Sequence, residues 1–331
     1  MSLEVIAEIA QGYEGDFKLA ELLTMGAIQS GADSIKFQLV YADELAVPSY
    51  EYYGLFKSLE MKVEQWGSII SLAHKHQRKL YFDIYGELSC NQAKDLGADG
   101  VKISTADFYN TTLVEKSIEL FDKVFISVAG VEVGELDSFL EKYENQTNII
   151  FMYGLQSEPT PLSESNLRKL TAYKNRYNHI PIGFMDHSSG DTKDAFYLPL
   201  MALASGVDYI EKHITLDRKL QIEDYISALS IDNFSIFIED INRLKESLGD
   251  GKLVVSKSEK KYKSVSGKVV VANRDIELGE TIDSKDLSLK RVDTNEFSPF
   301  FRKISDVHGM VSAHKILKNQ GVSKENLCKE N

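Results

Sequence analysis

Short apolar runs rich in β-branched residues alternate along the chain with segments in which apolar residues recur at helical spacing. Each run has the length and pattern of a buried strand. Eight of these runs begin near Val5, Ser34, Lys79, Gly100, Lys123, Asn148, Ile180 and Val207. The helical segments include Phe17–Ile28, Lys62–His74, Val133–Tyr143, Glu164–Tyr173, Asp191–Ala204 and Ile231–Leu248. This alternation is typical of an α/β protein with parallel strands.

A glycine-containing tripeptide marks three junctions between a helix and the next strand. Gly31-Ala-Asp33, Gly97-Ala-Asp99 and Gly206-Val-Asp208 each follow a helical segment and precede an apolar run. Glycine suits the end of a helix, where the chain adopts a positive φ. Eight strands and eight helices within about 250 residues favour a closed (β/α)8 TIM barrel. The alternative is an eight-stranded doubly wound sheet, although no Gly-rich dinucleotide or Walker motif follows any run.

The composition of the chain changes near residue 250. Residues 1–250 contain the strand–helix repeats, and we expect them to form the barrel domain. Residues 251–265 are polar and basic, which indicates a linker. Beyond them, apolar runs at Lys268–Ala272 and Leu287–Val292 flank a turn. This pattern predicts a small β-rich domain over residues 266–331.

The bulk composition narrows the classes of partner. With 331 residues, 43% hydrophobic and 27% charged, the chain has the make-up of a soluble globular protein. A net charge of -12 argues against nucleic acid or an anionic membrane as the main partner. The start of the chain shows no signal-peptide pattern, and no apolar stretch reaches the roughly 20 residues of a membrane span. Only two cysteines, Cys90 and Cys328, are present, so we expect a reducing cytoplasm.

Two histidines stand in equivalent places relative to the predicted strands. His187 follows the run at 180–186, and His213 follows the run at 207–212. In a barrel these two strands are neighbours, and their carboxyl ends open into the same mouth. Imidazole is a common metal ligand, and a metal with open positions can activate water or polarise a carbonyl. We therefore predict a metal pair; the alternative is that both histidines have hydrogen-bonded structural roles.

Other polar residues stand at the ends of the predicted strands. Lys36 and Lys102 lie inside apolar runs, where an unpaired ammonium group would be costly. Both are therefore expected to face the mouth and to favour an anionic ligand, such as a phosphate or a carboxylate. The remaining strand-end polar residues are Glu8, Gln38, Asp83, Ser104, Thr105, Ser127, Gln156, Glu158, Asp186 and Glu211.

Several of these segments resemble the sialic acid synthases. The similarity covers nearly the whole chain in order. A further resemblance, to that family's C-terminal antifreeze-like (SAF) domain, lies in residues 270–282 and 289–291. The segments that carry the synthase resemblance are 7–16, 31–38, 101–105, 159–161, 185–187 and 210–218.

The resemblance implies a reaction and a cofactor. Members of this family condense phosphoenolpyruvate with the aldehyde of an amino sugar, an N-acyl hexosamine of the N-acetylmannosamine type. The product is a nine-carbon 2-keto sugar acid for surface polysaccharide, and phosphate is released. The implied cofactor is a divalent metal held by His187 and His213. Manganese is the typical ion and magnesium is the alternative.

The same resemblance suggests roles on the donor side. Asp107 stands where the family has a glutamate beside the reacting carbon, and Glu8 is the second catalytic candidate. The residues that match phosphoenolpyruvate-binding positions are Lys36, Lys102, Thr105 and Ser127.

On the acceptor side, Gln38 and Asp224 match sugar contacts, and Gln156 is a further substrate-binding candidate. Arg291 matches an arginine that the small domain of one subunit extends into the mouth of the other. The resemblance therefore implies a homodimer with exchanged C-terminal domains.

The chain departs from the family pattern at several positions. Asp83 replaces a threonine at the phosphate, Glu158 replaces a tyrosine, and Met185 replaces a serine. Two added carboxylates would repel a phosphate unless the lysines or the metal offset them. A non-catalytic sugar-binding relative is therefore an alternative to the synthase. A third hypothesis is a related synthase for a shorter sugar phosphate, which usually lacks a SAF-like tail.

Overall fold

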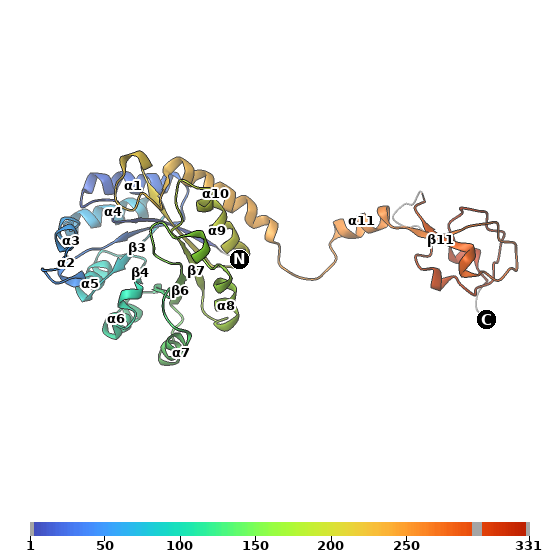
Figure 1. Cartoon of the computed structure of the whole chain (residues 1–331), viewed down its shortest axis with the longest axis horizontal. Helices are drawn as coiled ribbons and strands as arrows, with labels where there is room; N and C mark the ends of the chain where they lie inside the picture. Colours follow the sequence, from blue (N-terminus) through green and yellow to red (C-terminus); the bar gives the residue numbers. More distant parts are fainter. Residues whose placement is uncertain (1–2, 293–299, 329–331) are drawn as a thin grey trace. The chain divides into compact units, whose positions relative to one another are not determined.

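The protein consists of two compact units, Met1–Gly249 and Asp250–Asn331, which are described separately. The structure is a computed structural model and describes residues 3–292 and 300–328 (Figure 1). In the described part of the chain, no helix is both long and apolar enough to cross a bilayer.

The first unit is a closed barrel of eight parallel strands, as predicted. Each strand pairs with the next, and β1 also pairs with β8, which closes the sheet and excludes the doubly wound alternative. A short ninth strand, β9 (Leu229–Ser230), continues the pairing beyond β8. The barrel strands are β1 (Glu4–Ala10), β2 (Ser34–Gln38), β3 (Lys79–Ile84), β4 (Gly100–Ile103), β5 (Val124–Ser127), β6 (Ile149–Tyr153), β7 (Ile182–Asp186) and β8 (Tyr209–Thr215).

Helices surround the strands on the outside (Figure 1). Gly31, Gly97 and Gly206 follow three of them with φ of 87°, 81° and 80°, as predicted for helix ends. The helix predicted over Glu164–Tyr173 begins later, because Asn166 has a φ of 38° that no right-handed helix accommodates. The helices of this unit are α1 (Phe17–Gln29), α2 (Ala42–Leu45), α3 (Tyr53–Ser58), α4 (Val63–Lys75), α5 (Glu87–Asp95), α6 (Thr111–Leu120), α7 (Val133–Lys142), α8 (Arg168–Arg176), α9 (Asp194–Ala204) and α10 (Ile231–Lys245).

The barrel interior is apolar toward its amino-terminal end and charged toward its carboxyl-terminal end. Ile6 and Tyr81 belong to an apolar cluster inside the strands, and Tyr209 packs against it. Because side chains of a strand alternate with a period of two, the next interior positions lie two residues farther along. Those positions, one level up, are Glu8, Lys36, Asp83, Lys102, Glu211 and, beyond Glu211, His213.

The second unit is small and rich in β structure, as predicted. Its strands β10 (Val269–Ala272) and β11 (Leu287–Lys290) pair in antiparallel fashion, and Val270 and Ile276 lie in its core. The segment predicted as a linker is not all irregular, since it contains helix α11 (Lys257–Ser266). Ser256 begins that helix with a capping box, a local signal that the sequence interpretation overlooked.

Candidate active site

A cavity of about 370 Å³ opens at the carboxyl ends of the barrel strands, where TIM-barrel enzymes bind their substrates. A larger hollow of about 460 Å³ lies at the opposite end. Its Glu4 carboxylate is already paired with Lys79 and Lys123, at 2.8 and 2.7 Å, so this hollow has a structural explanation. The residues predicted from the sequence that line the smaller cavity are Glu8, Gln38, Asp83, Lys102, Ser104, Gln156, Glu158, His187, Glu211, His213 and Asp224.

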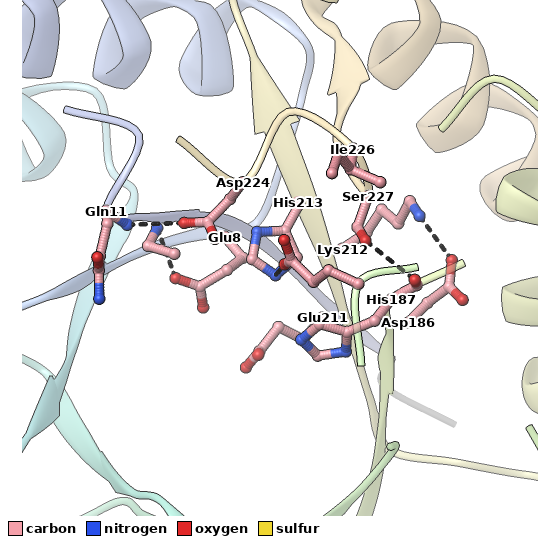
Figure 2. A network of polar contacts seen from close by, with 12 residues as sticks. Glu8, Gln11, Asp186, His187, Glu211, Lys212, His213, Asp224, Ile226 and Ser227 are labelled. Carbon is pink, nitrogen blue, oxygen red and sulfur yellow. Dashed lines mark hydrogen bonds and ion pairs between the residues drawn. The ribbon is translucent and has the colours of Figure 1, made fainter. Parts of the chain in front are cut away.

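The two histidines lie side by side in this cavity, on β8 and just beyond β7 (Figure 2). Their ring centroids are 5.0 Å apart. Burial lowers the pKa of His187 to about 4 and lowers that of His213 well below its usual value. Both rings are therefore neutral near pH 7, which is the form that binds a metal. In the described part of the chain, neither Nδ1 atom has a hydrogen-bond partner, so each of these nitrogens is free to coordinate a metal ion.

Glu158 supplies a third ligand atom at the same place. Ligand atoms of Glu158, His187 and His213 all lie within 4.8 Å of one another. The carboxylate Oε1 of Glu158 is 3.9 Å from Nε2 of His213. Partial burial and the negative charge of Asp224 together raise the pKa of Glu158 to about 7. Two imidazoles and one carboxylate form a donor set that suits a first-row transition metal with open positions.

A buried ion pair joins the two strands that carry the histidines, one residue before each ring. Nζ of Lys212 is 2.7 Å from Oδ2 of Asp186, and both side chains are fully buried. Ser188 donates its hydroxyl to the same carboxylate at 2.9 Å, and Ser227 donates to the carbonyl of His187 at 3.0 Å. Figure 2 shows the contacts of Lys212 with Asp186 and of Ser227 with His187 beside the rings. Because the pair joins β7 to β8, it fixes the backbones that carry both histidines.

A buried cluster of two lysines and three carboxyl groups lies at the floor of the cavity, and all of its members except Lys36 belong to the cavity lining. Nζ of Lys36 lies 2.8 Å from Asp83 and 3.7 Å from Glu211, and it also contacts Glu8. Nζ of Lys102 lies 2.8 Å from Glu211 and 3.3 Å from Asp83. All five side chains are buried. The predicted inward orientation of both lysines is therefore found, but each is already paired with protein carboxyl groups.

The carboxyl groups of this cluster have different proton affinities. Burial raises the pKa of Glu8 to about 8, with the nearby Glu211 and Asp83 contributing and the positive charge of Lys36 opposing. Burial also opposes ionisation of Glu211, but Lys102 and Lys36 prevail and hold its pKa at about 2. Near pH 7, Glu8 therefore carries a proton while Glu211 is ionised. Two carboxyl groups whose pKa values are pushed apart can serve as an acid and as an electrostatic partner.

Comparison with known proteins matches this chain to the NeuB family over residues 23–253 and to the SAF domain over residues 267–327. The chain belongs to the NeuB family. It is 25% identical to the N,N'-diacetyllegionaminic acid synthase of Campylobacter jejuni, over 91% of this chain and 95% of that protein. It is also 25% identical to the N-acetylneuraminate-9-phosphate synthase of Mus musculus, over 89% of this chain and 85% of that protein.

Solved structures agree with this assignment. The sialic acid synthetase of Leptospira borgpetersenii matches 80% of this chain and 92% of its own, with a TM-score of 0.73 and 27% identity. A putative spore coat polysaccharide biosynthesis protein E from Chromobacterium violaceum has a TM-score of 0.78 at 20% identity and shows the fold alone. The family thus contains sugar-acid synthases, as the resemblance predicted.

The remaining predicted donor-side residues of this NeuB-family barrel lie beside the cavity. The hydroxyls of Thr105 and Ser127 share a hydrogen bond of 2.9 Å, and Thr105 also donates to the carbonyl of Ala129 at 3.0 Å. Asp107 ends the 3₁₀ turn Thr105–Asp107 and accepts a long hydrogen bond of 3.5 Å from Asn110. Neither hydroxyl nor Asp107 belongs to the cavity lining, so their roles stay predictions.

On the predicted sugar side of the cavity, Gln11 connects Asp224 and Gln38 through hydrogen bonds. The backbone N–H of Gln11 donates to Asp224 at 3.0 Å, and its side chain donates to Gln38 at 2.7 Å. Burial raises the pKa of Asp224 to about 6. Arg291 belongs to the second unit, where its Nε donates to the carbonyl of Ser266 at 3.2 Å. Its predicted contact with a sugar stays a prediction.

Sequence reasoning missed several residues of the cavity. Gln11 directly follows β1, so its position at a strand end was a usable signal. Leu45 and Phe56 come from α2 and α3, which lie in the long connection after β2 and carry no periodic signal. Glu158 was predicted to lie at a strand end and was noted as a departure from the family, but it was not predicted as a metal ligand. Its position beside the histidines depends on the path of the loop after β6.

Proposed function

We propose that this NeuB-family protein condenses phosphoenolpyruvate with an N-acyl hexosamine of the N-acetylmannosamine type. Carbon 3 of the donor would form a bond to the sugar aldehyde carbon, water would add at carbon 2, and phosphate would leave. The supporting observation is that one cavity combines a neutral histidine pair with the buried lysine Lys102 and the protonated carboxyl group of Glu8. Polarising an aldehyde, holding an anion and supplying a proton are the three tasks this reaction requires.

The chain's own residues divide these tasks. The carboxyl of Glu8 carries a proton near pH 7 and can donate it to the aldehyde oxygen as negative charge develops there. Lys36 and Lys102 provide the positive charge for the donor. Gln38 and Asp224 line the same cavity and can accept hydrogen bonds from sugar hydroxyls. Excluding water from this buried floor strengthens each of these electrostatic interactions.

The cofactor we propose is Mn²⁺, held by His187, His213 and Glu158. When bound, such an ion supplies a Lewis acid that orients and polarises the aldehyde. Mg²⁺ is the alternative, but it prefers oxygen ligands and retains its waters, whereas two of the three ligands here are imidazoles. The donor set therefore favours manganese over magnesium.

We also propose that the protein is a homodimer in which each SAF domain serves the barrel of the other subunit through Arg291. The SAF match over residues 267–327 supports the domain assignment on which this proposal rests. The exchanged arrangement itself comes from the resemblance, and a cytoplasmic location likewise stays a prediction.

The test is Mn²⁺-dependent release of phosphate from phosphoenolpyruvate, screened over a panel of N-acyl hexosamines. Release with at least one sugar, accompanied by a nine-carbon keto acid in the mass spectrum, is the result that supports the proposal. If the metal-loaded protein releases no phosphate with any sugar, the synthase is the wrong function.

A non-catalytic sugar-binding protein is the second candidate. The observation in its favour is that Asp83 already pairs with both Lys36 and Lys102. Calorimetry with the same sugar panel separates the two candidates, because this alternative requires sugar binding without any phosphate release. Release of phosphate with any member of the panel excludes it.

A further inference from the structure

Asp83 bridges the two lysines of the donor side. It lies near the end of β3, between β2, which carries Lys36, and β4, which carries Lys102. Its two carboxylate oxygens are divided between the lysines: Oδ1 is 2.8 Å from Nζ of Lys36, and Oδ2 is 3.3 Å from Nζ of Lys102. Asp83 also lines the cavity, so an entering anion meets it directly.

The charge of the floor is balanced without any ligand. The ammonium groups of Lys36 and Lys102 are surrounded by the carboxyl groups of Glu8, Asp83 and Glu211, and each lysine contacts at least two of them. A phosphate dianion added here would bring two further negative charges into a buried region that has no unpaired positive charge to offset them. At separations of about 4 Å, such repulsion is far stronger in a protein interior than in bulk water, so it weakens the binding of the anion.

We propose that Asp83 is a built-in anion of the donor site: it holds Lys36 and Lys102 in the free protein, and a phosphate-bearing donor binds only by displacing it from them. Asp83 therefore sets the affinity for the donor and favours donors of low negative charge. The identity of the donor as phosphoenolpyruvate rests on the proposed function, but the competition between Asp83 and a phosphate does not.

The structure also indicates that Asp83 can be replaced without leaving a lysine unpaired. Lys102 keeps its contact with Glu211 at 2.8 Å, and Lys36 keeps its contacts with Glu8 and Glu211. Asp83→Thr replaces the charged carboxylate with a neutral hydroxyl and a methyl group. Asp83→Asn removes the charge at nearly constant volume. This second variant tests the proposal if the threonine variant does not fold.

The experiment measures the affinity of the metal-loaded full chain for phosphoenolpyruvate and, separately, for inorganic phosphate by calorimetry. We expect both variants to bind both anions about tenfold more tightly than the parent protein, or better. The matched control is Asp33→Asn, which removes a carboxylate from the opposite end of the barrel. Asp33 accepts the N–H of Val5 at 2.8 Å, a bond that an asparagine oxygen can also accept. The control should leave both affinities unchanged.

The outcomes separate this inference from the proposed function. Equal or weaker binding of both anions in the folded variants overturns the role of Asp83. An equal gain in Asp33→Asn overturns it too, because the effect would then be one of net charge alone. Tighter binding of inorganic phosphate without any binding of phosphoenolpyruvate upholds the inference and removes the proposed donor. Tighter binding of both anions without turnover upholds the inference and rejects the synthase.

Discussion

The imidazole rings of His187 and His213 meet edge to face, with centroids 5.0 Å apart and an interplanar angle of 65°. They come from adjacent strands, β7 and β8, whose register places Asp186 opposite Lys212, one residue before each histidine. This arrangement lets both rings approach one ion from the same side of the cavity. The ion pair behind them keeps that approach fixed.

His187→Ala should abolish phosphate release and lower the metal content of the purified protein. The reason is that the variant removes one of two imidazoles from a set of three ligand atoms. Metal content after dialysis is measured by mass spectrometry, together with activity at saturating Mn²⁺. His179→Ala, an exposed histidine elsewhere in the barrel, is the control and should retain both. Full activity in His187→Ala would refute the metal assignment.

Glu158→Gln should weaken metal binding by at least about tenfold while leaving the fold intact, because it removes the anionic ligand but keeps the shape, and the loss of a residue that merely supports a ligand already costs about that much. The measurement is a Mn²⁺ titration followed by calorimetry. The comparison is Gln156→Glu, which adds a carboxylate two residues away in the same cavity. An unchanged affinity in Glu158→Gln would mean that the ion is held by the histidines alone.

Much of the barrel could be predicted from the sequence because its signals are local. The Gly31, Gly97 and Gly206 junctions and the β-branched runs each act within a few residues, and the structure places strands at the predicted positions. The histidine pair followed from strand order alone. The pairing of Asp83 with two lysines could not be predicted, because it depends on the register of three strands. The place of Glu158 depends on the path of a loop.

The activity should fall as pH rises through about 8, since the proposed role of Glu8 requires its proton and its pKa is raised to about 8. Below that pH the carboxyl is protonated and competent; above it the proton is lost. The pH profile of kcat/KM measures this limb. Glu8→Gln should lose about 10²–10⁴-fold in rate. A descending limb at the same pH in the residual activity of this variant would show that another group titrates.

Lys212→Met should lower the free energy of unfolding of the barrel by about 3–5 kcal/mol, because it leaves the Asp186 carboxylate buried and uncompensated. The lone tryptophan, Trp66, is buried in the barrel and reports its unfolding by fluorescence during denaturant titration. The control is Lys174→Met, which breaks a partly exposed pair with Asp208 at 3.0 Å. That change should be worth no more than about 1 kcal/mol. Equal losses in the two variants would contradict the structural role of the Lys212 pair.

Arg291→Ala should raise the apparent KM for the sugar with a smaller effect on kcat, because the proposed arginine contacts the acceptor and not the reacting atoms. The measurement is the sugar dependence of phosphate release at saturating phosphoenolpyruvate and Mn²⁺. Arg302→Ala is the control, since Arg302 is an exposed arginine of the same unit. Among the hydrogen bonds of the described residues, its Nη1 donates only to the backbone carbonyl of Lys263. The control should leave the KM unchanged. If Arg291→Ala also leaves it unchanged, the small domain does not reach the sugar, and the exchanged dimer loses its functional basis.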